Sequence, residues 1–328
     1  MLTPKENYLA LVSNGTPDRF VNQYEAFGLI FTDPLRKMDK RIRGQDTIDP
    51  WGVTIRWPAD EHAGTPYVTD ETKVCDDITE WQSTVKAPDL DLPDDMWEAA
   101  KADAEKIRNE GQQLVTAYCT TGMFERLHFL MGFEDALCNL LMEPESVEEL
   151  LDYILEWRMK YMSILIDKLH PEAVFFHDDW GSKEQLFMRP EVWRELVKPR
   201  YQTLYGELNR QGIHVIHHSD SFCEPIVGDM VDVGIETWQG VLPSNNIPEI
   251  QKTVAGKLTL MGGLDAGKID RKGVTEEEVR AEVQRAIREY APGGHYIPSI
   301  TYGGPESIFP GVFETITDEI NKQSKLYF

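Results

Sequence analysis

The segment His214–Cys223 has the sequence HVIHHSDSFC, and this stretch indicates the fold of the whole chain. Three of the eight histidines fall within its first five residues, beside the valine and isoleucine that favour a β-strand. The strand run is followed by Ser219 and Asp220, and Cys223 comes three residues after the aspartate. Strand ends with clustered imidazole, carboxylate and thiol groups are typical of the functional face of an α/β barrel.

On both sides of this segment, short apolar runs alternate with stretches of helical periodicity, which predicts parallel βαβ units. Strands are expected at residues 19–26, 113–119, 173–176, 214–218, 235–239, 258–261 and 295–300. Helices are expected at 94–110, 122–142, 145–169, 190–209, 225–233, 248–255, 274–290 and 305–322. No GxGxxG or GxxxxGK[ST] motif follows an early strand, which disfavours the nucleotide-binding folds. The pattern therefore predicts an α/β fold of the (β/α)8 TIM-like barrel type.

Residues 28–93 differ from the rest, because they are rich in Trp, Pro, Asp and Thr and show little periodicity. We interpret them as a long excursion over one end of a single barrel domain spanning residues 1–328. A β-hairpin is expected near Val53–Trp57. An excursion of this size either shapes a substrate pocket or extends the packing, and both interpretations stay open.

Composition limits the partners. The chain has 328 residues and a net charge of -23, and it has no basic cluster, so nucleic acid and anionic membranes are not expected as partners. No apolar run is long enough to span a bilayer, and the N-terminus lacks the features of a signal peptide. The four cysteines are widely spaced and form no CxxC pair, which is typical of a cytoplasmic protein.

Residues at the C-terminal ends of parallel strands converge on one pocket. Applied to the predicted strands, this rule collects His177, Asp178, Asp179, His217, His218, Asp220, Gln239, Asp265 and Tyr302. Imidazoles and carboxylates are the groups suited to metal binding and proton transfer. Structural roles remain open: one of two adjacent histidines must point away from the pocket, and an aspartate after a strand often caps a turn. A lone cysteine such as Cys223 is more often a buried small apolar residue than a ligand.

Four groups of motifs add a family resemblance. They are TPKENY and PDR (residues 3–8 and 17–19), FHDDWG and RPE (176–181 and 189–191), IHHSD (216–220) and LMGGLD (260–265). Through the order and spacing of these motifs, the whole chain resembles the uroporphyrinogen decarboxylase superfamily. The resemblance implies a distorted (β/α)8 barrel.

The superfamily contains two chemistries. Its decarboxylases act on uroporphyrinogen without a cofactor and grip it with arginines and an aspartate of an N-terminal segment. The corresponding stretch here, FVNQYEAF at residues 20–27, contains no arginine, and we expect its Tyr24 to contact substrate. Other members transfer methyl groups to or from a corrinoid protein. The thiol-methylating branch holds zinc with His-x-Cys and a later Cys, but this chain has His218-Ser219-Asp220 there and no Cys in its final strand.

Apart from the decarboxylases and the thiol-methylating branch, the chain resembles the methyltransferases that demethylate methoxylated aromatics in anaerobic metabolism. The resemblance implies a cytoplasmic enzyme that passes a methyl group from an O-methyl donor to the cobalt of a corrinoid (cobalamin) carried by a partner protein. A phenolate, with a pKa near 10, leaves poorly unless it is protonated or bound to a Lewis acid.

On this hypothesis the catalytic groups are His218, Asp220 and Asp179, and a zinc ion, if present, would be held by His218, Asp220 and Cys223. Substrate contacts are expected from Tyr24, His177, Asp178, Gln239, Asp265 and Tyr302. Two alternatives stay open: a uroporphyrinogen-type decarboxylase acting on a porphyrinogen or another small acid, and a non-catalytic ligand-binding or carrier-docking barrel.

Overall fold

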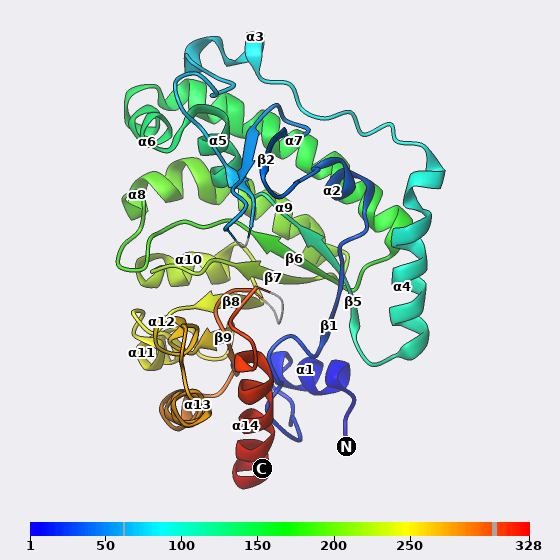
Figure 1. The fold of residues 1–328 in the computed structure, drawn as a ribbon, viewed down its shortest axis with the longest axis vertical. Helices are drawn as coiled ribbons and strands as arrows, with labels where there is room; N and C mark the ends of the chain where they lie inside the picture. Colours follow the sequence, from blue (N-terminus) through cyan, green and yellow to red (C-terminus); the bar gives the residue numbers. More distant parts are fainter. Residues whose placement is uncertain (62, 304–306) are drawn as a thin grey trace.

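Seven parallel strands form one sheet in a computed structural model of the chain, which describes residues 1–61, 63–303 and 307–328. Their order across the sheet is their order along the sequence: β1 (Phe27–Ile30), β5 (Leu114–Cys119), β6 (Ala173–His177), β7 (His214–His218), β8 (Thr237–Val241), β9 (Thr259–Gly263) and β10 (Tyr296–Ser299). The sheet curls, and helices lie around its outer face (Figure 1). This is the barrel-type α/β architecture that the sequence predicts, with seven strands among the described residues where a (β/α)8 barrel has eight.

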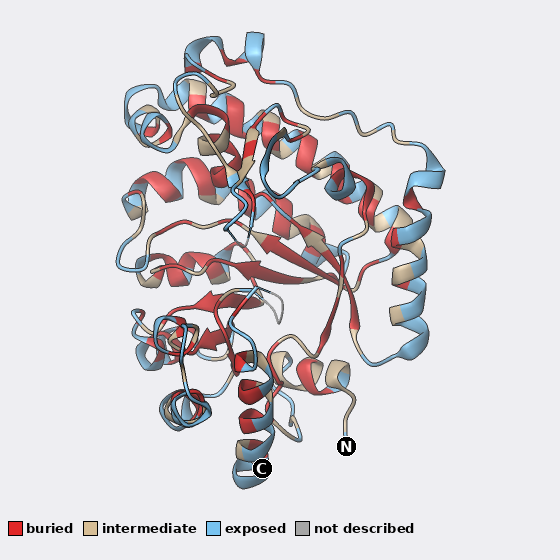
Figure 2. Ribbon diagram, in the orientation of Figure 1, coloured by how far each residue is buried: buried red, intermediate tan, exposed pale blue. Residues whose placement is uncertain are grey.

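The helices follow the strands in the expected places. The longer ones are α1 (Pro4–Val12), α4 (Glu98–Glu110), α5 (Met123–Met131), α6 (Phe133–Met142), α7 (Pro144–Leu169), α9 (Lys198–Arg210), α11 (Ile247–Val254), α13 (Glu276–Tyr290) and α14 (Val312–Tyr327). The short ones are α2 (Pro34–Met38), α3 (Trp81–Thr84), α8 (Pro190–Val192), α10 (Val227–Asp232) and α12 (Ala266–Ile269). The strands of this seven-stranded sheet are mostly buried, whereas the helices expose their outer faces (Figure 2). None of the described helices combines the length and the apolar character that crossing a bilayer requires.

The expected opening strand at residues 19–26 does not form. Gln23 has φ +52°, in the left-handed region that a strand cannot contain, and Glu25 N–H donates to Asn22 O in a turn. The first strand is β1, which starts at Phe27. The final helix was expected from residue 305, but α14 begins at Val312, and Pro305 itself lies outside the described residues.

The predicted helix at 190–209 is present with an irregular section. Between α8 and α9, residues Trp193–Val197 form a π-helical turn, directly before Pro199. Proline has no N–H to continue the regular ladder, and a wider turn on its N-terminal side is one way for a helix to accommodate it. The expected kink near Pro199 therefore takes the form of a π-turn.

A second, antiparallel sheet lies within residues 28–93. It comprises β2 (Gln45–Ile48), β3 (Thr54–Trp57) and β4 (Thr65–Pro66), so the hairpin expected near Val53–Trp57 is present. Asp49 shapes the β2–β3 turn, because its Oδ1 accepts from Trp51 N–H and Val53 N–H, both at 2.9 Å. Its Oδ2 accepts from Arg126 Nη1 at 2.7 Å, and this buried ion pair links the small sheet to α5.

One buried carboxylate, that of Asp178, joins the end of β6 to two helices. It accepts from the backbone N–H groups of Phe124 and Glu125 at 3.1 and 2.8 Å, at the start of α5. It also accepts from Tyr201 of α9 at 2.6 Å and from the indole of Trp180 at 2.9 Å. Burial and the charge of Glu125 raise the pKa of Asp178 to about 7, while these hydrogen bonds favour the carboxylate. A helix N-terminus is where a carboxylate is best stabilised.

The Asp178 contact requires a glycine at position 122. A Cβ added to Gly122 would overlap the side chain of Asp178. We therefore expect Gly122→Ala to lower the free energy of unfolding by about 2 kcal/mol or more, measured by urea denaturation, because the carboxylate is displaced from its donors.

Gly206→Ala is the matched control, because Gly206 lies inside α9 and an added Cβ meets nothing within 4 Å. This variant is expected to stabilise the protein by about 0.5–1 kcal/mol. Equal effects of the two substitutions would contradict the role assigned to Asp178.

Candidate active site at the ends of strands β6 and β7

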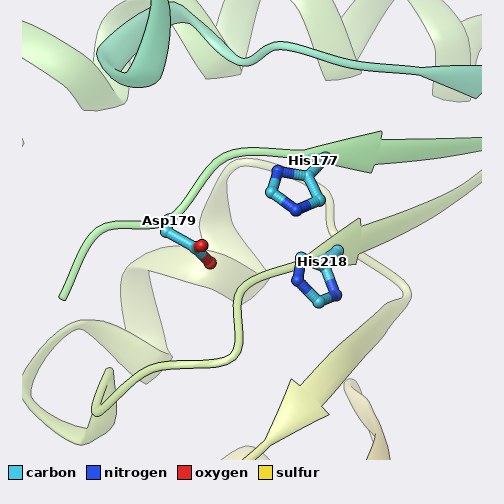
Figure 3. Close-up of side chains that lie close together, drawn as sticks. All are labelled: His177, Asp179 and His218. Atoms are coloured by element: carbon cyan, nitrogen blue, oxygen red, sulfur yellow. The ribbon is translucent and has the colours of Figure 1, made fainter. Parts of the chain in front are cut away.

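Three side chains at the C-terminal edge of the sheet form a cluster. The potential ligand atoms of His177, Asp179 and His218 all lie within 4.8 Å of one another. His177 and His218 are the last residues of β6 and β7 and are paired in register, so their rings stack at 4.3 Å between centroids and 21° between planes. Asp179, on the loop after β6, lies beside the two rings (Figure 3).

Hydrogen bonds orient both imidazoles in the same way. Nδ1 of His177 lies 2.9 Å from Oε2 of Glu125, and Nδ1 of His218 bonds Oε1 of Gln239. The amide of Gln239 is oriented by its own Nε2, which donates to Thr301 O at 3.2 Å. Because Nδ1–H donates in each ring, Nε2 is the atom left for a ligand or a proton transfer.

The two histidines have different charge states. Burial lowers the pKa of His177, but the charges of Glu125 and Asp179 outweigh it and raise the pKa to about 9. Burial, together with the charge of His177, lowers the pKa of His218 to about 4. Near neutral pH one ring is therefore an imidazolium and the ring stacked on it is neutral. Neighbouring groups whose pKa values are shifted in opposite directions are typical of sites of acid–base catalysis.

Asp220 borders the cluster without joining it. Its backbone N–H donates to Oδ1 of Asp179 at 3.1 Å, and burial, with the charge of Asp179, raises the pKa of its carboxyl to about 7. Cys223 lies elsewhere: it is fully buried, with Sγ 3.2 Å from Ser221 Oγ, and burial raises its pKa to about 12. Of the ligands predicted from sequence, only His218 is in the cluster, and His177 and Asp179 complete it.

Three other predicted residues lie outside the cluster. Asp178 faces α5 and α9, because successive side chains at a strand end alternate in direction. His217 lies on the same side, where the Tyr205 hydroxyl donates to its Nδ1 at 2.7 Å. Asp265 pairs with Lys268 at 2.9 Å and lines neither cavity described below.

An apolar cavity of about 450 Å³ opens from the cluster, with His177, His218 and Gln239 in its lining. Most of the remaining lining is aromatic: Tyr24, Phe31, Tyr118, Phe175, Tyr302 and Phe313. The sequence predicts Tyr24, His177, Gln239 and Tyr302 as substrate contacts, and the structure brings these four to one cavity. Among the described residues, no lysine or arginine lines this cavity.

A second, polar cavity of about 550 Å³ shares Tyr118 and His177 with the apolar cavity. Arg36, Arg41 and Glu125 line it, and the small sheet contributes Trp57 and Pro66. Glu125 was missed from the sequence. Its position three residues after Gly122 matches a capping box, but only the fold shows that the same carboxylate reaches His177.

The donor set of the cluster is of a kind that binds zinc. Two imidazole Nε2 atoms and one carboxylate are ligands that zinc prefers, and three protein ligands leave a position open, as in catalytic zinc sites. Glu125 and Gln239 supply the hydrogen bonds to Nδ1 that ligating histidines usually have.

Comparison with known proteins gives a family match. The family model "Uroporphyrinogen decarboxylase (URO-D)" matches residues 48–322. A methyltransferase from Methanosarcina mazei has a similar structure, with a TM-score of 0.70 and 14% sequence identity over 100% of both chains. A rutinosidase from Aspergillus niger aligns with a TM-score of only 0.34 and 9% identity, over 71% of this chain and 75% of that one, and supports no argument. No curated protein matches. At 14% identity, the likeness to the methyltransferase establishes the barrel fold.

Zinc binding should release protons, because a ligating histidine must be neutral and His177, with its pKa of about 9, is protonated near neutral pH. We expect the protein to release about one proton to the buffer for each zinc ion bound. The affinity for zinc should rise with pH up to about 9. Calorimetric titration of the metal-free protein in two buffers of different ionisation enthalpy measures this release. Unchanged zinc affinity in both His177→Ala and His218→Ala would rule out this ligand set.

Proposed function

The chain belongs to the uroporphyrinogen decarboxylase family, as the resemblance predicts, and from this premise we propose that it is a corrinoid-dependent methyltransferase. It transfers a methyl group from an O-methyl donor, a methoxylated aromatic compound, to a corrinoid carried by a partner protein. The full-length structural likeness to a methyltransferase supports this assignment.

The observation that carries the proposal is the junction of the His177–Asp179–His218 cluster with the apolar cavity. A cavity of about 450 Å³ lined by aromatic rings suits a flat apolar ligand. A ring bound there would place its methoxy group against the cluster when the group points to the inner end of the cavity. Proton donors and potential metal ligands then lie where the oxygen is released.

The transfer breaks the bond between the methyl carbon and the oxygen, and the electron pair stays on the oxygen. The corrinoid would supply the nucleophile that accepts the methyl group, and a zinc ion at His177, Asp179 and His218 would supply a Lewis acid. In the metal-free cluster, His177 donates its Nε2 proton to the leaving oxygen. Its pKa of about 9 is close to that of a phenol, near 10, so the proton is well matched to the developing phenolate.

The cavity also bears on the decarboxylase alternative. A tetrapyrrole with many carboxylates needs a cationic lining, and the described lining of the apolar cavity has no arginine or lysine. Asn22 and Gln23, in the segment that grips the tetrapyrrole in decarboxylases, instead bond Thr317 of α14. These contacts favour methyl transfer from a smaller ring that carries far fewer charges than a tetrapyrrole.

We expect His177→Gln to lower kcat about 100- to 1,000-fold, because it removes the proton donor or ligand at the leaving oxygen. The assay mixes the protein, a reduced corrinoid protein and a panel of methoxyaromatics, and follows methylcobalamin by its absorbance. Asp265→Asn is the control, because Asp265 lies on the loop after the barrel strand β9 but lines neither cavity, and kcat of this variant should stay within about twofold of that of the unmodified enzyme. Methyl transfer from no donor of the panel would overturn the proposal.

The acid role of His177 also predicts a pH dependence. With metal removed by a chelator, the rate should fall as pH rises through about 9, because the imidazolium is lost. Glu125→Gln removes the charge that raises this pKa, so the fall should move to lower pH. A profile that does not move in Glu125→Gln would exclude His177 as the acid.

A further inference from the structure

Arg36 is an exposed cation that lies over two aromatic rings in a strongly acidic protein. The chain has 56 Asp and Glu against 33 Lys and Arg. Even so, the guanidinium of Arg36 has neither a hydrogen bond nor an ion pair with any residue in the described part of the chain. Two rings hold it instead, with its Cζ 4.8 Å from the ring centroid of Tyr118 and 5.0 Å from that of Phe31. Cation–π contacts use the face of the guanidinium and leave its N–H edge free.

This free cation lies where the two cavities meet. Arg36 lines the polar cavity, and both of the rings that hold it line the apolar cavity. A continuous stack then leads to the cluster: Tyr118 stacks on Phe175 at 5.5 Å and 25°, and Phe175 on His218 at 6.2 Å and 29°. A ligand ring bound along this stack has the cluster at one end and the guanidinium at the other.

The other charges lining the polar cavity already have partners. Arg41 donates to Asp39 at 2.8 Å and to Gly64 O at 2.7 Å. Glu125 is bound to His177. Among the described lining residues, Arg36 is therefore the cation that lacks a counter-ion, and a carboxylate is the ligand group that guanidinium geometry fits best.

We propose that Arg36 binds a carboxylate of the methyl donor, so that the enzyme selects methoxylated aromatic acids over neutral methoxyarenes. The inference rests on the proposed function. The aromatic ring occupies the apolar cavity, and the acid group reaches its polar border. Against a net charge of -23, an anionic donor needs such a local cation to bind.

Binding of the demethylated product tests this without any methyl transfer. The probes are para-hydroxybenzoate and its neutral amide, para-hydroxybenzamide, titrated by calorimetry into the full-length protein. We expect the acid to bind at least tenfold more tightly than the amide. Arg36→Gln should weaken the acid about 10- to 100-fold and change the amide by less than about twofold.

Arg56→Gln is the matched control. Arg56 also lies over a ring, 3.4 Å from the centroid of Tyr67, but it is paired with Asp46 and lines neither cavity. Both ligands should bind this variant as they bind the unmodified protein. Equal weakening of acid and amide by Arg36→Gln, or no weakening of the acid, overturns the proposal, as does an amide that binds the unmodified protein as tightly as the acid.

The corrinoid assay separates this inference from the proposed function. With para-methoxybenzoate as the donor, Arg36→Gln should raise KM about 10- to 100-fold and leave kcat nearly unchanged. If the acid binds in an Arg36-dependent way but no donor gives methyl transfer, the result contradicts the proposed function and supports the anion site. If only neutral donors give methyl transfer, the result contradicts the anion site and supports the proposed function.

Discussion

The carboxylate of Asp178 is the constraint on which the site depends. It binds two N–H groups at the start of α5, the hydroxyl of Tyr201 and the indole of Trp180, with no exposure to solvent. Since it stands between His177 and Asp179 in the sequence, fixing Asp178 fixes the backbone that carries both. It also positions the first turn of α5, from which Glu125 reaches His177. Packing and site geometry therefore share one set of hydrogen bonds.

The two histidines of the cluster have the same side chain but different protonation states. His218 is buried and His177 is partly buried, and burial alone would favour the neutral form of both. A carboxylate bonded to His177 reverses the effect of burial there, whereas His218 has only the neutral amide of Gln239. The proton therefore resides on one ring. This asymmetry gives the site a proton donor and a lone pair side by side, which is the arrangement that the proposed chemistry needs.

The alternating pattern predicted most of the barrel, because buried strands and amphipathic helices each leave a local periodicity. The rule for strand ends then placed His177, Asp179, His218, Gln239 and Tyr302 at one edge, and they do line one site or its cavity. The rule could not predict which of Asp178 and Asp179 faces the site. Neighbouring side chains alternate in direction, so the answer depends on the exact residue at which the strand ends. Glu125 and Arg36 come from helices that follow other strands, so only the tertiary fold brings them to the site. The expected strand at 19–26 failed at Gln23, whose left-handed φ has no signal in the sequence.

The small sheet of β2, β3 and β4 lines one side of the polar cavity through Trp57 and Pro66. Among the described residues, none of its strands pairs with a strand of the barrel. Its link to α5 through Asp49 and Arg126 lies outside the cluster. The exposed side chains of this sheet are therefore free to vary, whereas buried residues such as Val53 and Ile55 belong to the same core cluster as the barrel. Substitutions at the exposed positions of the small sheet would change which molecules enter the polar cavity, while the barrel and the histidine pair keep their structure. Related chains with the same cluster can therefore differ in substrate specificity.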